Sequence, residues 1–169
     1  MNTNQFVSRN SHIDRDTRDS VLKYETMAAA WGKLPSHDLI TLALLPGVLS
    51  RYALRQFAIS IVRRVGDVSA GTIVHRAVLT TKWFSEGSIP ENLFAKYSEA
   101  MKRHIRESIT RYWTRELAIA LLDTNSIRAA MSVSDLAFSW SISTKEERYT
   151  TEYNRQAKWL RMFTKPKFE

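Results

Sequence analysis

The stretch Ser50-Arg-Tyr-Ala-Leu-Arg-Gln-Phe-Ala-Ile-Ser-Ile-Val-Arg-Arg-Val65 decides the fold that the sequence predicts. Its apolar side chains recur at the i, i+3, i+4, i+7 spacing of a single helix face. They are Leu54, Phe57, Ala58, Ile61, Val62 and Val65. Such a face has to pack against other helices, so we expect it to be buried. Arg51, Arg55 and Arg63 lie off the face, and we expect them to be solvated or paired at its rim.

The same spacing predicts helices along most of the chain. The ranges expected are 14–31, 36–45, 69–85, a long helix after Ser88 that reaches about residue 122 with a bend or break near 110–116, 127–140, and a last helix that ends at 163. The range 69–85 is rich in β-branched residues, which makes a strand the competing interpretation, but four turns of helical spacing favour a helix. We expect this helix and residues 50–65 to form a hairpin beneath the long helix. The predicted fold class is all-α, a compact bundle of about six or seven helices.

Local signals mark several helix ends. Ser88-Ile-Pro-Glu91 predicts a capping box, in which the serine hydroxyl and the glutamate carboxylate bind backbone N–H groups. Thr144-Lys-Glu-Glu147 predicts a second capping box, and Ser36 is expected to cap the helix that it begins. Gly32 and Gly87 are expected to end the helices that precede them.

The length of 169 residues is typical of one domain. Residues 1–13 are polar and unpatterned, which predicts a flexible N-terminal segment. We expect residues 14–164 to form a single helical domain and residues 165–169 to form a short basic tail. The chain has no cysteine, so it has no disulfide and no thiolate site, and a reducing compartment fits this composition.

Residues that could carry catalysis are scattered. The four histidines, His12, His37, His75 and His104, lack the i+3 or i+4 spacing of a metal site on one helix. The sequence contains no P-loop, dinucleotide fingerprint or nucleophile elbow. We therefore expect no enzymatic activity, no metal site and no cofactor.

No apolar run approaches the roughly 20 residues of a membrane span. The longest run, Leu39 to Leu49, is interrupted by Pro46 and Gly47. The first ten residues also lack the apolar core of a signal peptide. We therefore expect no membrane association and a cytoplasmic location.

The net charge of +8 is spread along the chain, and it favours either an acidic protein partner or nucleic acid. One basic group on the helix after Ser88 comprises Lys102, Arg103, Arg106, Arg111 and Arg115. Glu99, Glu107 and Glu116 are interleaved with these residues. A solvated, internally paired face is therefore the alternative to a phosphate-binding track.

A second basic group surrounds the last helix and comprises Arg148, Arg155, Lys158, Trp159 and Arg161. Basic side chains with aromatic residues between them hold phosphates and single-stranded nucleic acid. Basic residues in the last turn of a helix also complement its dipole, so both interpretations stay open.

A helix–turn–helix pattern runs through the central region and the last helix. Its residues are Leu54-Arg-Gln-Phe-Ala58, Arg63, Arg64, Ala77, Phe84, Gly87, Pro90, Glu91, Leu93, Gln156, Leu160 and Arg161. In this pattern the chain resembles helical immunity proteins of bacterial toxin systems and related helical modules of planctomycete proteins. The resemblance implies a non-enzymatic protein that binds and neutralises another protein, with no catalytic residue to carry over. The chain departs from that family in being less rich in alanine and richer in arginine.

Two hypotheses of function follow from these observations. The first is a non-enzymatic binding protein, an inhibitor or immunity-like partner, that acts through a protein–protein surface. The alternative is a nucleic-acid-binding protein that uses the basic helices over 102–115 and 148–167, and its binding should fall steeply with salt. The sequence leaves open the partner, the oligomeric state and whether the basic residues converge on one face.

Overall fold

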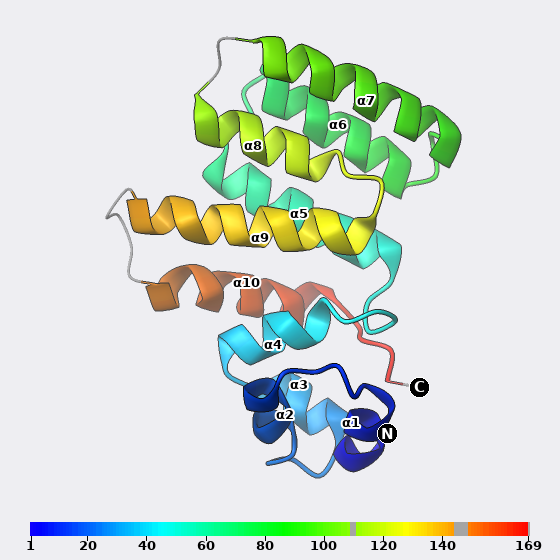
Figure 1. Ribbon diagram of the computed structural model, residues 1–169, viewed down its shortest axis with the longest axis vertical. Coiled ribbons are helices and arrows are strands. Elements are labelled where there is room, and N and C mark those ends of the chain that lie inside the picture. The colour runs from blue at the N-terminus through cyan, green and yellow to red at the C-terminus, as the bar shows by residue number, and fades with distance from the viewer. Residues whose placement is uncertain (109–110, 144–148, 169) are drawn as a thin grey trace. The chain divides into compact units, whose positions relative to one another are not determined.

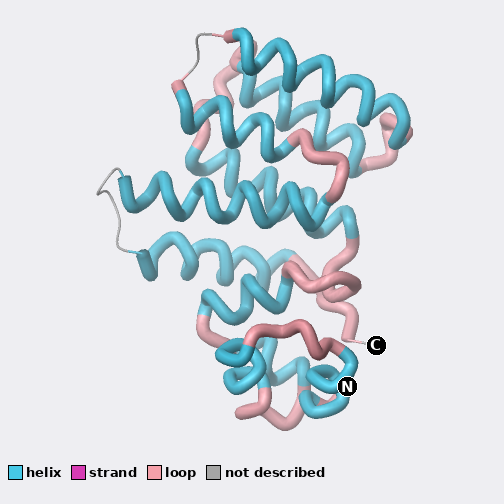
Figure 2. Tube along the Cα trace, viewed as in Figure 1, coloured by secondary structure: helices cyan, strands magenta, loops and turns pink. Residues whose placement is uncertain are grey.

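Figures 1 and 2 show the computed structural model, which describes residues 1–108, 111–143 and 149–168. Within these residues the helices are α1 (Thr3–Arg9), α2 (Arg15–Val21), α3 (Met27–Lys33), α4 (Ser36–Ala43), α5 (Arg51–Val65), α6 (Ile73–Ser85), α7 (Glu91–Glu107), α8 (Tyr112–Leu121), α9 (Ser126–Ser143) and α10 (Tyr149–Phe163). The described residues contain no strand, and an isolated bridge pairs Asn2 with Thr26. The predicted all-α fold is confirmed, while the helices are more numerous than the predicted six or seven.

Additional helix breaks account for much of this difference. The range 14–31, predicted as one helix, contains both α2 and α3, because residues 22–26 leave the helical conformation. The Thr26 hydroxyl then accepts a hydrogen bond from the Ala29 N–H at 3.2 Å and caps α3. Gly32 lies within α3, so the prediction that it ends a helix is wrong. The long helix predicted after Ser88 is likewise divided into α7 and α8, close to the predicted break.

The chain divides into two compact units. Unit 1 consists of Met1–Ser50 together with Tyr153–Glu169, and unit 2 consists of Arg51–Glu152. Unit 1 therefore contains α1 to α4 and most of α10, whereas unit 2 contains α5 to α9. The sequence predicted one helical domain over residues 14–164, with a flexible segment before it and a short basic tail after it.

Unit 1 includes both segments that were predicted to lie outside the domain. Residues 1–13, expected to be flexible, contain α1, in which Phe6 is buried. In the predicted basic tail, residues 165–169, the Lys167 N–H donates a hydrogen bond to the Val48 carbonyl at 2.8 Å. Both segments therefore contribute ordered contacts to unit 1.

The ring of Phe168 joins the two ends of the chain within unit 1. Its centroid lies 5.9 Å from that of Phe6 and 5.8 Å from that of Trp31, in edge-on arrangements. Aromatic pairs of this kind stabilise a fold by about 0.5–1.5 kcal/mol beyond the burial of their area. Single aromatic residues in polar segments show no periodicity, which is why the sequence did not predict this packing.

In unit 2, α5 packs against α6 and α9, and α8 packs against α9, α6 and α7 (Figure 1). Leu54, Phe57, Ile61 and Val62 of α5 are buried, which confirms the predicted core face. Burial of each of these side chains contributes about 1.5–3 kcal/mol. The contact between α5 and α6 also confirms the predicted hairpin.

The turn between α6 and α7 differs from the predicted capping box at Ser88. Gly87 has a φ of 76°, and its N–H donates to the Phe84 carbonyl at 3.1 Å. The Ser88 N–H donates to the Trp83 carbonyl at 2.8 Å. These two bonds form a Schellman motif, so Gly87 ends α6 as predicted and Ser88 belongs to that end.

Helix α7 begins at Glu91, and Pro90 occupies its N-cap position without a side-chain hydrogen bond. A proline disfavours the helical conformation of the residue before it. This disfavours Ile89 as the first residue of a helix that Ser88 caps. Because Pro90 is the N-cap, the prediction of a capping box at Ser88 is wrong.

Ser36 is also not an N-cap. Pro35 occupies that position, and the Ser36 hydroxyl donates to Oδ1 of Asn154 at 2.6 Å. This bond joins the start of α4 to α10 within unit 1. The second predicted capping box, over residues 144–147, lies outside the described residues.

Candidate functional site

Helix α7 carries two apolar faces. Phe94, Ser98 and Ile105 are buried, whereas Leu93 and Tyr97 are 40% and 50% exposed. The apolar spacing of the sequence predicts that Leu93, Phe94, Tyr97 and Ile105 share one face. Consecutive helical residues point about 100° apart, so the row that begins at Leu93 is separate from the row that begins at Phe94.

Helix α6 is divided in the same way. Val74 and Ala77 are buried, whereas Trp83 is 47% exposed. Phe84 follows Trp83 and turns inward, where its ring stacks on Phe94 with centroids 4.1 Å apart and an interplanar angle of 6°. The inward faces thus hold α6 against α7, and the outward faces remain open.

The outward rows of the two helices, together with the buried Ile105, line a groove of about 680 Å³. The α6 row lies at the spacing i, i+3, i+7, i+10, so it forms one continuous edge, and the α7 row forms the facing edge. The volume lies in the range of binding sites for small molecules and short segments. The lining residues are Ile73, Arg76, Thr80 and Trp83 from α6, Ser88, Ile89 and Pro90 from the turn, and Leu93, Tyr97, Ala100, Met101, His104 and Ile105 from α7.

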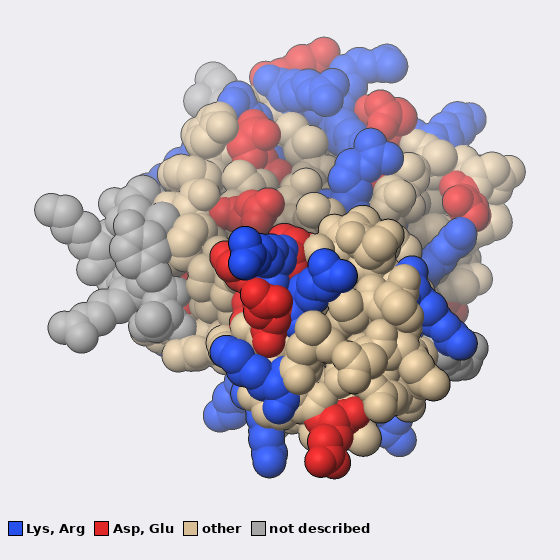
Figure 3. All heavy atoms as spheres, turned by 60° about the horizontal axis from the view of Figure 1, so that its bottom comes forward, with Lys and Arg blue, Asp and Glu red and all other residues tan. Residues whose placement is uncertain are grey.

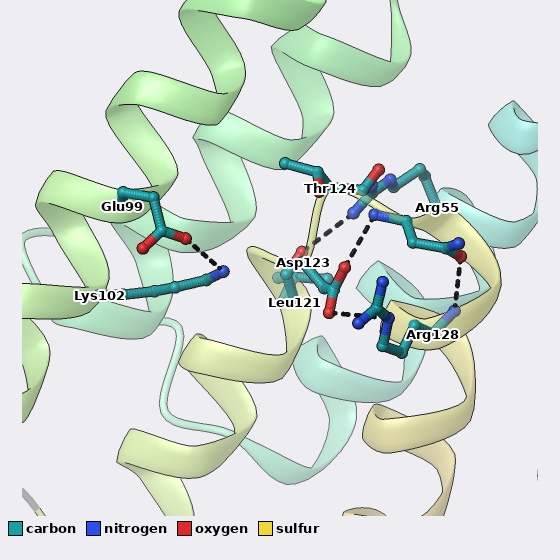
Figure 4. Close-up of polar contacts among 8 residues, drawn as sticks. Arg55, Glu99, Lys102, Leu121, Asp123, Thr124 and Arg128 are labelled. Atoms are coloured by element: carbon teal, nitrogen blue, oxygen red, sulfur yellow. Dashed lines mark hydrogen bonds and ion pairs between the residues drawn. The ribbon is translucent and has the colours of Figure 1, made fainter.

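Arg55 of α5 joins the stacked rings to the rest of unit 2. Its guanidinium carbon lies 5.4 Å from the centroid of Phe84 and 5.2 Å from that of Phe94, within the range of a cation–π interaction. Its Nη1 donates to the Leu121 carbonyl at 3.2 Å, and its Nη2 donates to the Thr124 carbonyl at 2.7 Å (Figure 4). One side chain therefore contacts α6, α7 and the end of α8.

The prediction that Arg55 is solvated or paired at the rim of its helix is wrong, because Arg55 is 1% exposed. Burial lowers the pKa of Arg55 to about 10, and the nearby carboxylates of Asp123 and Glu91 act in the opposite direction. This pKa is still far above neutral pH, so the guanidinium keeps its charge inside unit 2. Arg51 and Arg63 are exposed, as predicted for them.

The groove is apolar with a positive bias. Among its lining residues, Arg76 and His104 are the ones that can carry a positive charge, and none is a carboxylate. The carboxylates of the two helices and their connecting turn lie outside the lining, and three of them form the ion pairs Lys82–Glu86 at 3.8 Å, Lys102–Glu99 at 3.0 Å and Arg51–Glu91 at 3.7 Å.

The first predicted basic group lies on α7 and α8, and its members differ in environment. The Lys102 side chain is 14% exposed and pairs with Glu99. Arg115 pairs with Glu116 at 3.1 Å and lies 5.5 Å from the centroid of the Tyr112 ring. The exposed members are Arg103, Arg106 and Arg111. The break between α7 and α8 separates the members beyond it from the others, so the group does not follow one helix.

The second predicted basic group belongs, where it is described, to unit 1. Arg161 donates hydrogen bonds to the Trp31 carbonyl at 3.3 Å and to the Leu34 carbonyl, so it holds the end of α3. Arg148 lies outside the described residues. The remaining members are the exposed Arg155 and Lys158 and the half-buried Trp159. The structure therefore places the two basic groups in different units.

Figure 3 shows one face of the molecule with its charged residues coloured. Lys and Arg side chains are interspersed with Asp and Glu side chains among the described residues of this face. Such mixed charge is typical of a solvated surface.

Comparison of the chain with protein-family models, curated proteins and solved structures found no match. The described part of the chain contains no helix with the length and hydropathy of a bilayer span. In the same residues, no group of three or more histidines, cysteines or carboxylates is placed to hold a metal ion. The groove is therefore interpreted from its own residues.

The α6 side of the groove was not predicted from the sequence. The row of α6 residues that lines the groove contains Arg76 and Thr80. These two residues are polar, so the row does not show up as a run of apolar side chains at helical spacing. The signal that marks the row is the pair Trp83-Phe84, because two consecutive aromatic residues on a helix cannot share one face. When the inward face takes Phe84, the neighbouring tryptophan has to point elsewhere.

Proposed function

We propose that this chain is a non-enzymatic binding protein that contacts another protein through the groove between α6 and α7. The observation that carries the proposal is the exposure of Trp83, Leu93 and Tyr97 around one cavity. Clustered exposed apolar side chains mark surfaces that a partner covers. Tryptophan and tyrosine are also among the residues that contribute most binding energy at protein–protein interfaces.

Buried contacts under the groove support the proposal. Phe84 stacks on Phe94, and the guanidinium carbon of Arg55 lies 5.4 and 5.2 Å from the two ring centroids. The Schellman motif fixes the turn that closes one end of the groove. A site that is already formed loses less conformational entropy when its partner binds.

The alternative, binding of nucleic acid, has less support. A phosphate track needs several cations on one surface. The basic residues proposed for it belong to two units, and Arg115 and Arg161 already bind groups of the protein itself. The net charge of +8 favours nucleic acid and an acidic protein equally well.

Inhibition of the partner is the mode of action that the resemblance to immunity proteins implies. A protein of that kind acts by covering a surface of its target, and it needs no catalytic residue. The resemblance supports inhibition by surface coverage as the mode of action, and the exposed residues of the groove support the groove as the contact surface.

Site-specific photocrosslinking in cells that naturally contain the chain tests the proposal. Benzoylphenylalanine replaces Tyr97 in the groove or, as a matched control, Tyr112, which is 57% exposed and does not line the groove. We expect a protein to crosslink at position 97 alone, and we expect the change Trp83→Ser to remove this crosslink. Capture of the same proteins at both positions contradicts the proposal.

A second measurement tests the alternative. Short single- and double-stranded DNA and RNA are titrated with the chain at low salt, and binding is followed by fluorescence anisotropy. Tight binding that weakens steeply with salt and is unaffected by Trp83→Ser favours nucleic acid over the groove.

A further inference from the structure

The groove has a polarity along its length. α6 and α7 are consecutive helices joined by the short turn over residues 86–90, so they lie side by side and run in opposite directions (Figure 1). Trp83 and Leu93 therefore lie near the turn, whereas Arg76 and His104 lie toward the other end. Apolar residues line both ends of the groove, and its arginine and histidine lie at the end away from the turn.

The length of the groove fits a short helix. From Ile73 to Trp83 the α6 row extends about 15 Å, and from Leu93 to His104 the α7 row extends about 16 Å, at 1.5 Å per residue. Two facing rows of similar length accommodate the apolar face of a helix of about three turns. A bound strand needs a sheet edge for its backbone hydrogen bonds, and the described residues contain no strand.

The charge of the groove indicates the character of that helix. No lining residue is a carboxylate, and among the described residues Arg76 has no ion-pair partner. A carboxylate on the bound helix complements this guanidinium. The net charge of +8 also attracts an acidic partner from a distance and repels a second copy of the same chain.

We infer that the groove binds an amphipathic helix of about three turns from an acidic partner protein. Its large apolar residues lie at the Trp83 end, and a carboxylate lies at the Arg76 end. The inference rests on the proposed function and adds the chemistry of the partner. The apolar residues, spaced i, i+3 or i+4, and i+7, fill the groove, while the carboxylate accepts charge-assisted hydrogen bonds from the arginine.

Selection from a displayed library of random peptides about three helical turns long tests the inference. The bait is the purified full chain, and the Trp83→Ser variant is used for counter-selection. We expect the peptides enriched on the unmodified chain to carry a net negative charge and apolar residues at helical spacing. Enrichment of neutral or basic peptides overturns the inference but leaves a groove that binds protein segments. If no peptide distinguishes the chain from its Trp83→Ser variant, both the inference and the proposed function fail.

Binding of a fluorescein-labelled enriched peptide then distinguishes the contribution of the carboxylate–Arg76 interaction to affinity from that of apolar packing. We expect Arg76→Gln to weaken its binding about tenfold and to leave unchanged the binding of an analogue whose carboxylates are replaced by amides. Arg103→Gln is the matched control, because Arg103 is an exposed arginine of α7 outside the groove lining. Equal losses for the peptide and its amide analogue, or for the two variants, overturn the assignment of the carboxylate to Arg76.

A second copy of the chain could also fill the groove, and sedimentation velocity tests this possibility. We expect a monomer in the absence of peptide. A dimer that Trp83→Ser dissociates assigns the groove to self-association and overturns the inference. Trp83 and Arg76 are exposed, and circular dichroism of each variant checks that its helices are retained.

Discussion

Unit 1 and unit 2 each use an arginine from a distant helix to hold the C-terminal end of another helix. In unit 2, Arg55 of α5 donates to the carbonyl of Leu121, the last residue of α8. In unit 1, Arg161 of α10 donates to the carbonyls of Trp31 and Leu34 at the end of α3. The last carbonyls of a helix lack backbone partners and carry a partial negative charge, and a guanidinium satisfies both needs.

The two arginines differ in burial. Arg55 is 1% exposed, whereas Arg161 is only half-buried. A carbonyl that loses its donor in a buried site stays unpaired, whereas one near the surface can bind water. We therefore expect the hydrogen bonds of Arg55 to contribute more to the stability of unit 2 than those of Arg161 contribute to unit 1.

Replacement of Arg55 has the largest expected effect. Arg55→Leu removes two charge-assisted hydrogen bonds, one to the Thr124 carbonyl and one to the buried Leu121 carbonyl, which then keeps, among the described residues, only the bond from the Thr81 hydroxyl at 3.3 Å. We therefore expect the free energy of unfolding to fall by about 3–5 kcal/mol. Urea denaturation followed by circular dichroism measures the change. Arg51→Leu is the control on the same helix, because its side chain is 84% exposed, and it should change stability by less than about 0.5 kcal/mol. Equal stability of the two variants contradicts the structural role of Arg55.

Replacement of Arg161 sharpens the comparison. Arg161→Leu removes hydrogen bonds from a charged donor at a half-buried site, and we expect a loss of about 1.5–3 kcal/mol in the same denaturation experiment. Lys158→Leu, an exposed position on α10, serves as the control. If Arg161→Leu lowers stability as much as Arg55→Leu does, the difference in burial between the two arginines does not determine their contributions to stability.

The comparison extends to a carboxylate at a helix N-terminus in unit 1. Asp14 caps α2 by accepting a hydrogen bond from the Thr17 N–H at 2.9 Å, and this bond lowers the pKa of Asp14. We expect Asp14→Ala to cost about 1 kcal/mol at neutral pH. Because the pKa of the folded state is the lower one, this contribution is present above the unfolded value of 3.8 and is lost as pH falls through the folded value. Denaturation at several pH values should therefore show that the free energies of unfolding of Asp14→Ala and the parent protein converge in acid. A difference that does not narrow contradicts the role of the Asp14 carboxylate as the cap of α2.

The smallest effect is expected for a carboxylate of unit 2. Asp135 of α9 lies at the surface, yet partial burial raises its pKa. A raised pKa favours folding below the unfolded value of 3.8, and this gain is lost as pH rises through the folded value. Asp135→Asn should therefore stabilise the protein slightly at neutral pH, by less than about 0.5 kcal/mol after solvent screening. If Asp135→Asn instead lowers the free energy of unfolding at neutral pH, the expected direction of the effect is wrong.

The sequence predicted the main packing face of unit 2 but not its charged core residue. The stripe through Leu54 and Phe57 follows from helical spacing alone. Helical spacing also predicts that Arg55 faces solvent, because a charged residue beside an apolar stripe is usually exposed. Ile59, which lies one turn beyond Arg55 and is 2% exposed, is the signal that this side of α5 is also buried.

The candidate site could be predicted only in part. The apolar spacing identifies Leu93, Tyr97, Met101 and Ile105, but it places Leu93 and Tyr97 on the same face as the buried Phe94. Sequence spacing cannot show how much of a helix its neighbours cover. The α7 helix packs chiefly against α6 and α8, which leaves the second row exposed.

The division of the chain has a consequence for synthesis on the ribosome. Unit 2 is continuous in sequence, whereas unit 1 needs both Met1–Ser50 and Tyr153–Glu169. Domains generally fold as units while the chain is being made. Helices α1 to α4, although translated first, must wait for Arg161 and Phe168 before their packing is complete. In a nascent chain that stalls after residue 152, the N-terminal third is therefore the part exposed to chaperones and proteases.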